Sequence, residues 1–225
     1  MNGFTSGPQS SMKRISESTV GRLSLYLRIL REYAGGRTIS SEELAGAAGT
    51  SAAQVRKDLS LFGTFGKRGL GYSVPELTAE LRSILGLEQE WNVALVGAGR
   101  IGQALFGYQD FRTQGFYIRA VFDSDPAKVG QRWNGTEVRS DAELEQGLAE
   151  EAIDIVIVAV PGGAAQTVVD RVVAAGVRAI LNFAPTRIEV PSGVALKNVN
   201  MAVELEGLSY ALASERANSG RGRAD

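Results

Sequence analysis

Residues 93–102 run Val93-Ala94-Leu95-Val96-Gly97-Ala98-Gly99-Arg100-Ile101-Gly102, an apolar stretch that leads into a glycine-rich turn. The apolar stretch predicts a buried strand, and residues 103–106 after the turn predict a helix. In this context the spacing Gly-x-Gly-x-x-Gly is typical of a dinucleotide-binding fold. Gly97 would form the tight turn, Gly99 would let a pyrophosphate approach the backbone, and Gly102 would permit close helix packing. The stretch predicts an α/β domain of Rossmann-like type.

An acidic residue follows where such a site needs one. Asp123 ends the next predicted strand, 21 residues after Gly102. A carboxylate there accepts hydrogen bonds from a ribose diol and repels a 2′-phosphate, and Asp125 adds to the repulsion. We therefore expect NADH or NAD+, rather than the 2′-phosphorylated forms. The residues predicted to bind it at this end are Gly97, Ala98, Gly99, Arg100, Ile101, Gly102 and Asp123. The alternative is a glycine-rich turn that binds nothing.

Short β-rich runs alternate with helical stretches from residue 91 onward. The predicted strands are 93–96, 118–122, 155–160 and 177–183, and their alternation with helices implies a parallel sheet. Ligands bind at the carboxyl ends of such strands. Two loops at those ends would border the nicotinamide half of the cofactor, and ordinary turn chemistry explains them equally well. Their residues are Val160 and Pro161 in one loop, and Phe183, Ala184 and Pro185 in the other.

The amino-acid composition excludes many common kinds of enzyme active site. The 225 residues, 44% of them hydrophobic and 22% charged, include no cysteine and no histidine. The sequence therefore lacks disulfides, thiolate ligands, and the commonest general base and metal ligand. Beyond the N-terminal part the only lysines are Lys128 and Lys197, and we expect neither at a cofactor loop. No catalytic residue and no metal site are predicted, and a cofactor site without such chemistry indicates a sensor.

Charge divides the chain into two parts. Residues 1–86 hold 11 Lys and Arg against 7 Asp and Glu, whereas residues 87–225 hold 13 against 18. A basic N-terminal part suggests a polyanionic partner, although an ordinary solvated surface has the same balance. No apolar run reaches the ~18 residues of a membrane span, and the polar start lacks a signal-peptide core. We expect a cytoplasmic protein with no membrane partner.

The N-terminal part has the pattern of a helix-turn-helix. Ser40 and Glu43 can form a capping box that opens a short helix, and Gly49 can end it. A second box at Ser51 and Gln54 would open the next helix, through about residue 62. A preceding helix would bury one face made of Val20, Leu23, Leu27 and Leu30. The core expected under the two short helices is Leu44, Ala45, Val55 and Leu59.

The second short helix and the loop after it are basic. A recognition helix meets base edges and phosphates, where Gln pairs with adenine and Arg or Lys with guanine or phosphate. Residues 63–72 carry four glycines around Lys67 and Arg68, which predicts a tight β-ribbon, a wing able to enter the minor groove. The alternative is a protein-binding or dimerisation module with a solvated basic loop. The residues predicted to contact DNA are Lys13, Arg14, Ser51, Gln54, Arg56, Lys57, Lys67, Arg68 and Tyr72.

Six segments together point to one family. They are residues 22–28, 40–44, 54–59, 65–72, 96–99 and 180–185. From about residue 13 to 212 the sequence resembles the Rex family of redox-sensing transcriptional repressors. The resemblance implies a homodimer that binds an inverted-repeat operator in double-stranded DNA and is released by NADH. It also implies that the C-terminal helix, about 203–213, is swapped onto the partner, although its apolar residues would suit packing within one protomer as well.

One position departs from the family pattern. Family members commonly have an Asp in the segment matching residues 198–201, and the resemblance implies that it pairs across the dimer with residues matching Arg22 and Tyr108. This chain has Asn200 there, which can hydrogen-bond but cannot form a charged pair. Met201 matches an apolar position near the partner's nicotinamide. The implied switch residues are therefore Arg22, Tyr108, Asn200 and Met201.

The predicted organisation has five parts. They are a disordered lead (1–12), a winged-helix DNA-binding domain (13–86), a Rossmann dinucleotide-binding domain (87–202), a C-terminal dimerisation helix (203–216) and a disordered tail (217–225). Two other classes stay open. One is a small NAD-dependent oxidoreductase with an accessory helical domain, which the missing histidine and substrate domain disfavour. The other is a winged-helix protein whose Rossmann domain binds coenzyme A.

Overall fold

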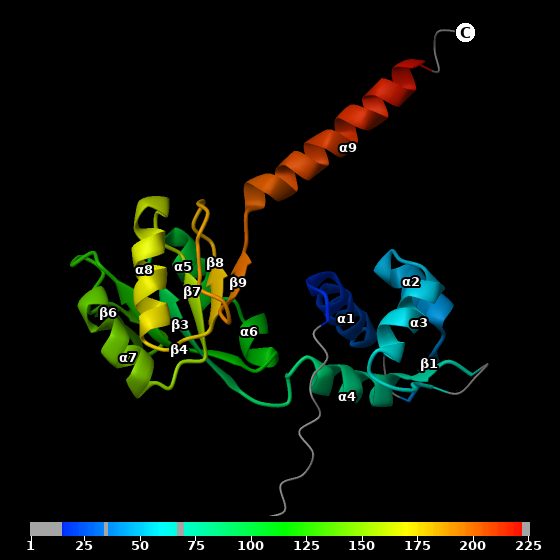
Figure 1. Cartoon of the computed structure of the whole chain (residues 1–225), viewed down its shortest axis with the longest axis horizontal. Coiled ribbons are helices and arrows are strands. Elements are labelled where there is room, and N and C mark those ends of the chain that lie inside the picture. The colour runs from blue at the N-terminus through cyan, green and yellow to red at the C-terminus, as the bar shows by residue number, and fades with distance from the viewer. Residues whose placement is uncertain (1–14, 34–35, 67–69, 222–225) are drawn as a thin grey trace, which may run out of the picture. The chain divides into compact units, whose positions relative to one another are not determined.

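The computed structural model describes residues 15–33, 36–66 and 70–221, except for the side chains of residues 217–221. The chain forms two compact units, residues 1–89 and 90–225, each with its own core (Figure 1). Within the described ranges, no helix combines the length and apolar character needed to cross a membrane. The same residues contain no cluster of acidic side chains arranged to hold a metal ion.

The first unit is helical with one small antiparallel sheet. Its elements are α1 (Glu17–Leu30), β1 (Thr38–Ile39), α2 (Ser41–Ala48), α3 (Ala52–Ser60), β2 (Tyr72–Ser73) and α4 (Val74–Ile84). The capping box predicted for α2 is confirmed, because the Ser40 hydroxyl accepts from the Glu43 N–H and the Glu43 carboxylate accepts from the Ser40 N–H. Gly49 ends α2 with a φ of 64°, a left-handed conformation that favours glycine. Helices α2 and α3 therefore form the predicted helix-turn-helix.

The core of this unit matches the sequence pattern with one exception. The predicted core residues Leu44, Ala45, Val55 and Leu59 are buried, as are the three leucines predicted on α1. Val20 is a correction, because it is 38% exposed. Thr19 is buried in the turn before Leu23 instead, and its hydroxyl lies 2.9 Å from the Ser16 hydroxyl that caps α1. A satisfied hydroxyl makes that burial inexpensive.

The loop predicted to be a β-ribbon has a different construction. Residues 63–66 form no strand, and β2 pairs antiparallel with β1, with Ile39 opposite Tyr72. The two arms of the loop still meet, because a Cβ at Gly66 would overlap the carbonyl oxygen of Gly71. Positive φ values of 73° at Gly66 and 81° at Gly71 turn the backbone sharply. Lys67 and Arg68 lie outside the described residues.

The second unit is a mostly parallel seven-stranded sheet with helices on both faces. Its strands are β3 (Trp91–Val96), β4 (Phe116–Asp123), β5 (Arg132–Trp133), β6 (Thr136–Ser140), β7 (Ile155–Val158), β8 (Ala179–Asn182) and β9 (Ala195–Asn198). Its α-helices are α5 (Arg100–Phe106), α6 (Asp110–Thr113), α7 (Leu144–Glu150), α8 (Gly162–Ala174) and α9 (Met201–Arg221). This is the predicted α/β fold, which is confirmed, with an antiparallel β5 added at one edge.

The strand order defines where a ligand fits. The order is β5-β6-β4-β3-β7-β8-β9, and every neighbouring pair except β5 with β6 is parallel. From β3 the chain adds strands first on the β4 side and then on the β7 side. The topological switch point therefore lies between β3 and β7, at whose carboxyl ends open α/β sheets bind ligands.

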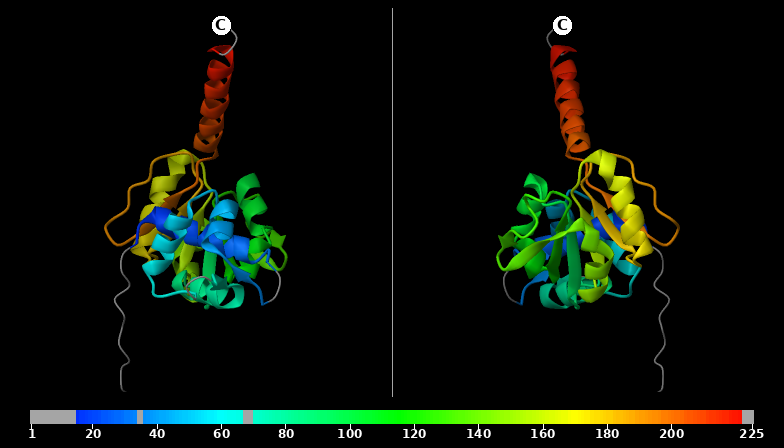
Figure 2. Two further views of the ribbon diagram at one scale, coloured as in Figure 1. Left: turned by 90° about the vertical axis from the view of Figure 1, so that its right-hand side faces the viewer. Right: turned by 90° about the vertical axis from the view of Figure 1, so that its left-hand side faces the viewer.

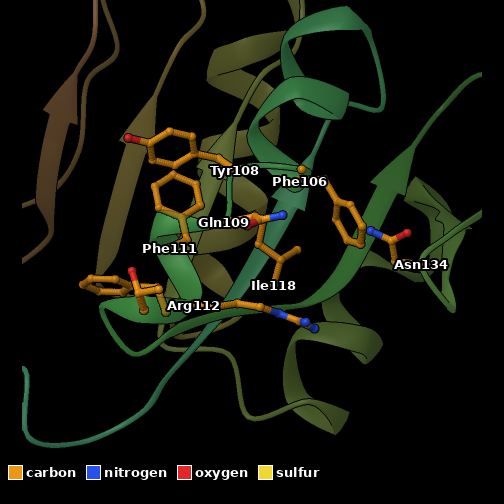
Figure 3. Close-up of a pocket in the computed structure, with 10 residues that line it drawn as sticks. Phe106, Tyr108, Gln109, Phe111, Arg112, Ile118 and Asn134 are labelled. Carbon is orange, nitrogen blue, oxygen red and sulfur yellow. The ribbon is translucent and has the colours of Figure 1, made fainter.

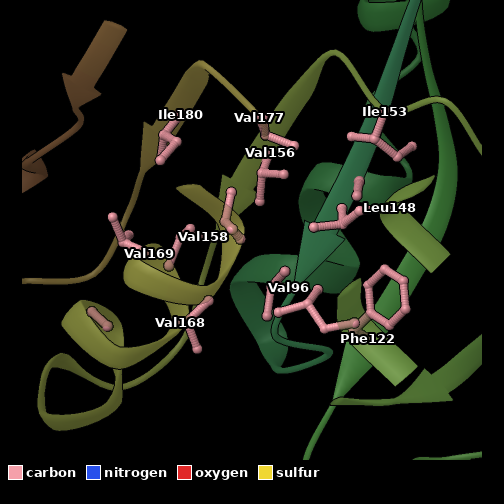
Figure 4. Packing of buried hydrophobic residues seen from close by; sticks show 14 of the residues in the cluster. Val96, Phe122, Leu148, Ile153, Val156, Val158, Val168, Val169, Val177 and Ile180 are labelled. Carbon is pink, nitrogen blue, oxygen red and sulfur yellow. The ribbon is translucent and has the colours of Figure 1, made fainter. Parts of the chain in front are cut away.

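Each face of the sheet has its own core. Helices α7 and α8 cover one face, where Phe122, Leu148, Val158 and Val169 are buried (Figure 4). Helices α5 and α6 cover the other, over buried residues that include Leu95. Figure 2 shows α8 (yellow) and α5 (green) on opposite sides of the strands.

The C-terminal helix α9 is exposed along its described side chains. Every side chain from Met201 to Ala213 is exposed, so these side chains are not packed against the sheet of their own unit. The helix continues to Arg221, which corrects the disordered tail predicted from residue 217. Alanine, glutamate and arginine in residues 211–217 favour helix, which explains its continuation through the weaker formers at 218–220.

Candidate dinucleotide site and nucleic-acid interface

Two glycines of the turn after β3 are required by packing. Gly97 has a φ of 107°, and a Cβ there would overlap the carbonyl oxygen of Ala159. A Cβ on the buried Gly102 in α5 would overlap the carbonyl oxygen of Gly97. The turn, α5 and the loop after β7 are therefore held together by backbone contacts that only glycine permits.

The third glycine, Gly99, is not required by the fold. Its φ of −80° and ψ of −171° suit any residue, and a Cβ there would meet no protein atom within 4 Å. Gly99 is also the N-cap of α5, where the first N–H groups of a helix have no intrahelical acceptor. Backbone that is open to close approach, beside such N–H groups, suits a pyrophosphate. The turn therefore fits the predicted cofactor.

Asp123, at the end of β4, is fastened to this turn. Its Oδ2 accepts a hydrogen bond from the Ala98 N–H at 2.6 Å, and its Oδ1 accepts one from the Asp125 N–H at 2.8 Å. Burial raises the pKa of Asp123, but these N–H groups and the nearby ammonium of Lys128 outweigh it and hold the pKa below its ordinary value. A charged acceptor therefore stands beside the glycine turn, where the predicted ribose contact requires one.

Lys128 corrects the expectation that no lysine lies at a cofactor loop. Its ammonium lies 3.2 Å from Asp123 Oδ2 and 3.6 Å from Asp125 Oδ2. A turn that begins at Asp125 brings it there, because the Lys128 N–H donates to the Asp125 carbonyl at 2.9 Å. Its single positive charge offsets only one of the two carboxylates, so negative charge remains in excess at the predicted ribose contact. Nothing in the spacing of the sequence predicts that Lys128 lies beside the end of β4.

The loops after β7 and β8 lie at the same edge of the sheet. The first meets the glycine turn at Ala159, and a Cβ at Gly162 would lie 3.4 Å from the Thr186 Cβ of the second. In these loops Val160 and Phe183 are half-buried, Ala184 is buried, and Pro161 and Pro185 are exposed. All the residues predicted to bind the cofactor therefore gather at the carboxyl ends of β3, β4, β7 and β8.

Asn182 organises the loop after β8, a role that the sequence did not reveal. It is fully buried, its Oδ1 accepts from the Ala184 N–H at 2.9 Å, and its Nδ2 donates to the Asn198 Oδ1 at 2.9 Å. The Val199 N–H donates to its carbonyl oxygen at 2.8 Å. Asn182 thus joins the loop predicted at the nicotinamide to the end of β9, just before α9. A polar residue closing an apolar strand is the only sequence signal.

A pocket of about 380 Å³ lies at the C-terminal end of α5 (Figure 3). Phe106, Phe111, Arg112 and Ile118 are among its lining residues, and none comes from the glycine turn. Tyr108, a predicted switch residue, forms part of the wall and is 53% exposed. Its ring packs edge-on against Phe111, with the ring centroids 5.1 Å apart. Tyr108 therefore stands on an accessible surface.

Helix α3 exposes polar side chains, as a recognition helix requires. Arg56 and Lys57 are exposed, and the Arg56 guanidinium lies 3.0 Å from the Glu42 carboxylate. An exposed pair of this kind contributes little stability, so Arg56 can exchange its partner at small cost. Ser51 caps the helix by accepting from the Gln54 N–H at 3.2 Å.

A buried carboxylate, Asp58, holds α3 to α1. Its side chain accepts from Arg22 at 2.6 and 2.7 Å, from the Tyr26 hydroxyl at 3.0 Å and from the Gln54 carboxamide at 2.8 Å. Burial raises the pKa of Asp58, but the hydrogen bonds from Arg22, Gln54 and Tyr26 outweigh it and hold the pKa below its ordinary value. Burial and, to a smaller extent, the hydrogen bond to Asp58 raise the pKa of Tyr26 to about 12. No residue close to Asp58 in the sequence indicates this role, because its partner Arg22 lies 36 positions away.

Two predictions about the first unit are wrong, one about the capping box of α3 and one about a residue expected to contact DNA. The second capping box does not close, because the Gln54 carboxamide is bonded to Asp58 rather than to the Ser51 N–H. Tyr72 is 8% exposed and belongs to the core of the first unit, with its hydroxyl 3.3 Å from the Ser41 hydroxyl. Its burial leaves no surface for DNA. Lys13, Arg14, Lys67 and Arg68 lie outside the described residues and stay predictions.

Asn200 and Met201 begin the exposed helix α9. The Asn200 Oδ1 accepts from the Ala202 N–H at 3.0 Å, so Asn200 is the N-cap of α9. Met201 is 62% exposed. Arg22, the remaining predicted switch residue, is bound to Asp58 of its own chain.

A helix-turn-helix unit joined to an α/β unit with a dinucleotide-type turn defines a class, DNA-binding proteins with a built-in nucleotide-cofactor domain. Family models divide the chain in the same way. Residues 14–60 match the model described as "Putative DNA-binding protein N-terminus", and residues 88–186 match the one described as "CoA binding domain".

Comparison with named relatives identifies the family. The chain is 47% identical over 206 residues to the redox-sensing transcriptional repressor Rex of Desulfitobacterium hafniense, covering 91% of this chain and 98% of that protein. It is 44% identical over 205 residues to Rex of Streptomyces coelicolor, covering 90% and 80%. The chain belongs to the Rex family of redox-sensing transcriptional repressors. Its relatives are named for regulation, which is not an enzymatic role.

Solved structures of one Rex-family repressor, RSP, have the same fold. RSP in complex with beta-NAD+ and operator DNA matches with a TM-score of 0.86 at 37% identity, covering 95% of this chain and 100% of that chain. RSP in complex with beta-NADH matches with a TM-score of 0.83 at 36% identity, covering 92% and 98%.

Alanine substitutions should separate the glycines of the turn into two kinds. Gly99→Ala is expected to leave the free energy of unfolding within about 0.5 kcal/mol of the wild-type value and to weaken NADH binding, because its Cβ would meet no protein atom within 4 Å but would fill space proposed for the pyrophosphate. Gly102→Ala should cost at least about 2 kcal/mol, since its Cβ overlaps backbone. Urea unfolding without cofactor and calorimetric NADH titration measure the two effects. Unchanged NADH affinity in Gly99→Ala would contradict a pyrophosphate at this turn.

Removing the Arg22 guanidinium should destabilise the first unit in a pH-dependent way. At pH 7, Arg22→Ala is expected to lower the free energy of unfolding by about 3 kcal/mol, because Asp58 stays buried with only neutral donors. The folded-state pKa of Asp58 lies below its unfolded value, so the pair stabilises above about pH 4 and its contribution is lost as pH falls further.

Urea unfolding at a series of pH values measures this difference. The exposed Arg28 on the same helix provides the control, because Arg28→Ala should show no such loss. A difference between wild type and Arg22→Ala that stays constant from pH 7 to pH 3 would show that Asp58 is not the group responsible.

Proposed function

We propose that this protein is a dimeric repressor that binds an inverted-repeat operator when free of cofactor or bound to NAD+, and is released by NADH. One observation carries the proposal. A single chain joins a glycine turn open to a pyrophosphate at Gly99 with a recognition helix that exposes Arg56 and Lys57. The names of its relatives, and the RSP complexes with beta-NAD+, operator DNA and beta-NADH, support it.

The cofactor would lie across the carboxyl ends of the central strands. Residues 97–102 would hold its pyrophosphate, through the free N–H groups at the start of α5, and Asp123 would bind its ribose. The charges of Asp123 and Asp125 disfavour a 2′-phosphate. The bound cofactor supplies a nicotinamide ring whose oxidised form is cationic and whose reduced form is neutral. Apolar surroundings favour the neutral form. The residues proposed to provide them are Val160, Pro161, Phe183, Ala184 and Pro185.

Operator recognition would use α3 in the major groove and the loop after it in the minor groove. A phosphate can replace Glu42 as the partner of Arg56, because their exposed ion pair contributes little. Each phosphate contact adds affinity that does not depend on base sequence and falls with salt. The residues proposed to contact DNA are Lys13, Arg14, Ser51, Gln54, Arg56, Lys57, Lys67 and Arg68.

The apolar residues of α9 support a homodimer. Six of them are each more than half exposed, namely Met201, Val203, Leu205, Leu208, Tyr210 and Leu212. Met201, Leu205, Leu208 and Leu212 recur at steps of four and three residues and therefore share one face of the helix, whereas Val203 and Tyr210 lie on the opposite face. Exposed apolar side chains gathered in this way mark an interface, and a helix swapped onto a second copy would bury them in both protomers. The two-fold symmetry of such a dimer would match an inverted repeat.

The switch would involve Arg22, Tyr108, Asn200 and Met201. Tyr108, Asn200 and Met201 are exposed in the single chain, where a second copy can reach them. Arg22 already forms a bidentate pair with Asp58. The partner's Asn200 offers hydrogen bonds but no charge, so it competes weakly with Asp58 for this guanidinium. We therefore expect Arg22 to stay with Asp58 in most of the dimer population.

The domain roles follow from these sites. The winged-helix domain would span 13–86, the dinucleotide domain 87–202, and the dimerisation helix 203–216 within α9. A repressor that acts on an operator works where the DNA is, so the proposed location is the cytoplasm.

Cofactor-dependent release from DNA tests the proposed function. The probe is a labelled inverted-repeat duplex that the protein itself selects from a random library. Fluorescence anisotropy at fixed salt then measures how tightly the protein binds it. NADH is expected to weaken binding at least ~10-fold, whereas NAD+ and coenzyme A change it less than ~2-fold. Asp123→Ala should bind DNA as the wild type does without cofactor and lose the response to NADH.

Two results would count against the proposed function. DNA binding indifferent to NADH would remove the sensor role. Equal loss of DNA binding and NADH binding in Asp123→Ala would contradict two separate sites.

Charges on the apolar surface of α9 should break the dimer. Leu205→Asp combined with Leu208→Asp is expected to convert a dimer into a folded monomer, because each carboxylate would be buried without a partner. Light scattering coupled to size exclusion measures the mass. Ser209→Asp, an exposed polar position of the same helix, serves as the control and should remain dimeric. A double variant that keeps the wild-type mass would exclude α9 as the interface.

A further inference from the structure

We propose that Asp58 fixes the direction in which Gln54 presents its carboxamide, so that α3 recognises a base amino group, that of adenine or cytosine, in the major groove. The inference rests on the proposed function, since it concerns how the operator is distinguished from other DNA. Asp58 is then a positioning residue, because it acts on DNA only through Gln54.

Asp58 has no acceptor capacity to spare. It is 1% exposed, and each of its oxygens has two donors. Oδ1 accepts from Arg22 Nη2 at 2.7 Å and from Gln54 Nε2 at 2.8 Å. Oδ2 accepts from Arg22 Nε at 2.6 Å and from the Tyr26 hydroxyl at 3.0 Å. A buried carboxylate with four donors is satisfied only while every donor stays in place.

This arrangement determines which end of the Gln54 carboxamide points inward. An ionised carboxylate is an acceptor only, so Gln54 must turn its NH2 group toward Asp58. The reversed amide would place Oε1 against Oδ1, two acceptors facing each other at a buried site. The low pKa of Asp58 keeps it ionised at neutral pH. Oε1 of Gln54 is therefore the atom directed away from the carboxylate, on a half-buried side chain of the recognition helix.

A carbonyl oxygen presented to the major groove selects among the bases. Adenine and cytosine display an amino donor there, whereas guanine and thymine display acceptors in the corresponding place. An unconstrained glutamine can turn its amide to suit either kind. Gln54 held by Asp58 cannot, because rotation would leave the carboxylate short of a donor. Asp58 thus makes Gln54, whose carboxamide could either donate or accept, present only its acceptor oxygen to the DNA.

Base analogues test the direction of the amide without altering the protein. Anisotropy with duplexes carrying each single base change, for wild type and Gln54→Ala, first locates the base pair whose preference depends on Gln54. Adenine or cytosine is expected there. Replacing it by the analogue that lacks only the amino group, purine for adenine or 2-pyrimidinone for cytosine, should weaken wild-type binding at least ~5-fold. Where the base is adenine, 7-deaza-adenine, which lacks N7, should bind as adenine does.

A variant pair tests the role of Asp58. Asp58→Asn keeps the shape but lets the two amides turn together, so the preference for the amino group should fall below ~2-fold while binding to unrelated DNA is unchanged. Tyr26→Phe is the matched control. It removes another donor from the same carboxylate but leaves the contact with Gln54, so the preference should persist. A merely structural role of Asp58 would make the two variants behave alike.

The outcomes separate this inference from the proposed function. If the wild-type protein selects no duplex, the proposed function itself fails. The inference alone is overturned if a duplex is bound but no base pair depends on Gln54, if guanine or thymine is preferred there, or if removal of the amino group has no effect. Should Asp58→Asn fail to fold, the analogue experiment on the wild-type protein still decides.

Discussion

The close backbone contact between Gly102 and the carbonyl oxygen of Gly97 is the constraint on which the cofactor edge depends. It places α5 directly against the end of β3, and the positive φ of Gly97 then turns the chain so that the Ala98 N–H reaches Asp123 on β4. The same turn lies against Ala159 after β7. Three strand ends and one helix are thus positioned by backbone contacts of the turn, and a larger residue at Gly97 or Gly102 would separate them.

Features signalled by neighbouring residues could be predicted from the sequence, and features made by distant residues could not. The glycine turn and the Ser40 capping box each depend on a few consecutive residues, so their chemistry is visible in one stretch. The pairing of Arg22 with Asp58 joins residues 36 positions apart, and nothing local indicates it. Tyr72 was misassigned for the same reason, since its burial follows from the pairing of β2 with β1 rather than from its basic neighbours.

Asp58 and Asp123 follow one physical rule in the two units. Each is a nearly buried carboxylate whose pKa is held below its ordinary value by hydrogen bonds that outweigh burial. Such a group destabilises the fold unless all of its donors are in place. For Asp123 the donors include the backbone of the glycine turn, and for Asp58 they include a side chain of the recognition helix. Burying a charge in this way makes the geometry of each binding surface a condition of folding.

Redox sensing also requires that cofactor binding differ between two arrangements of the protein, since a ligand with equal affinity for both shifts neither. The loop proposed for the nicotinamide is bonded through Asn182 to Asn198 and Val199, and the next residue, Asn200, caps α9. A rearrangement of this loop therefore acts on the base of the helix proposed to form the dimer. Because Asn200 carries no charge, it can contribute hydrogen bonds but no charged pair to this coupling. DNA must weaken NADH binding by the same factor by which NADH weakens DNA binding.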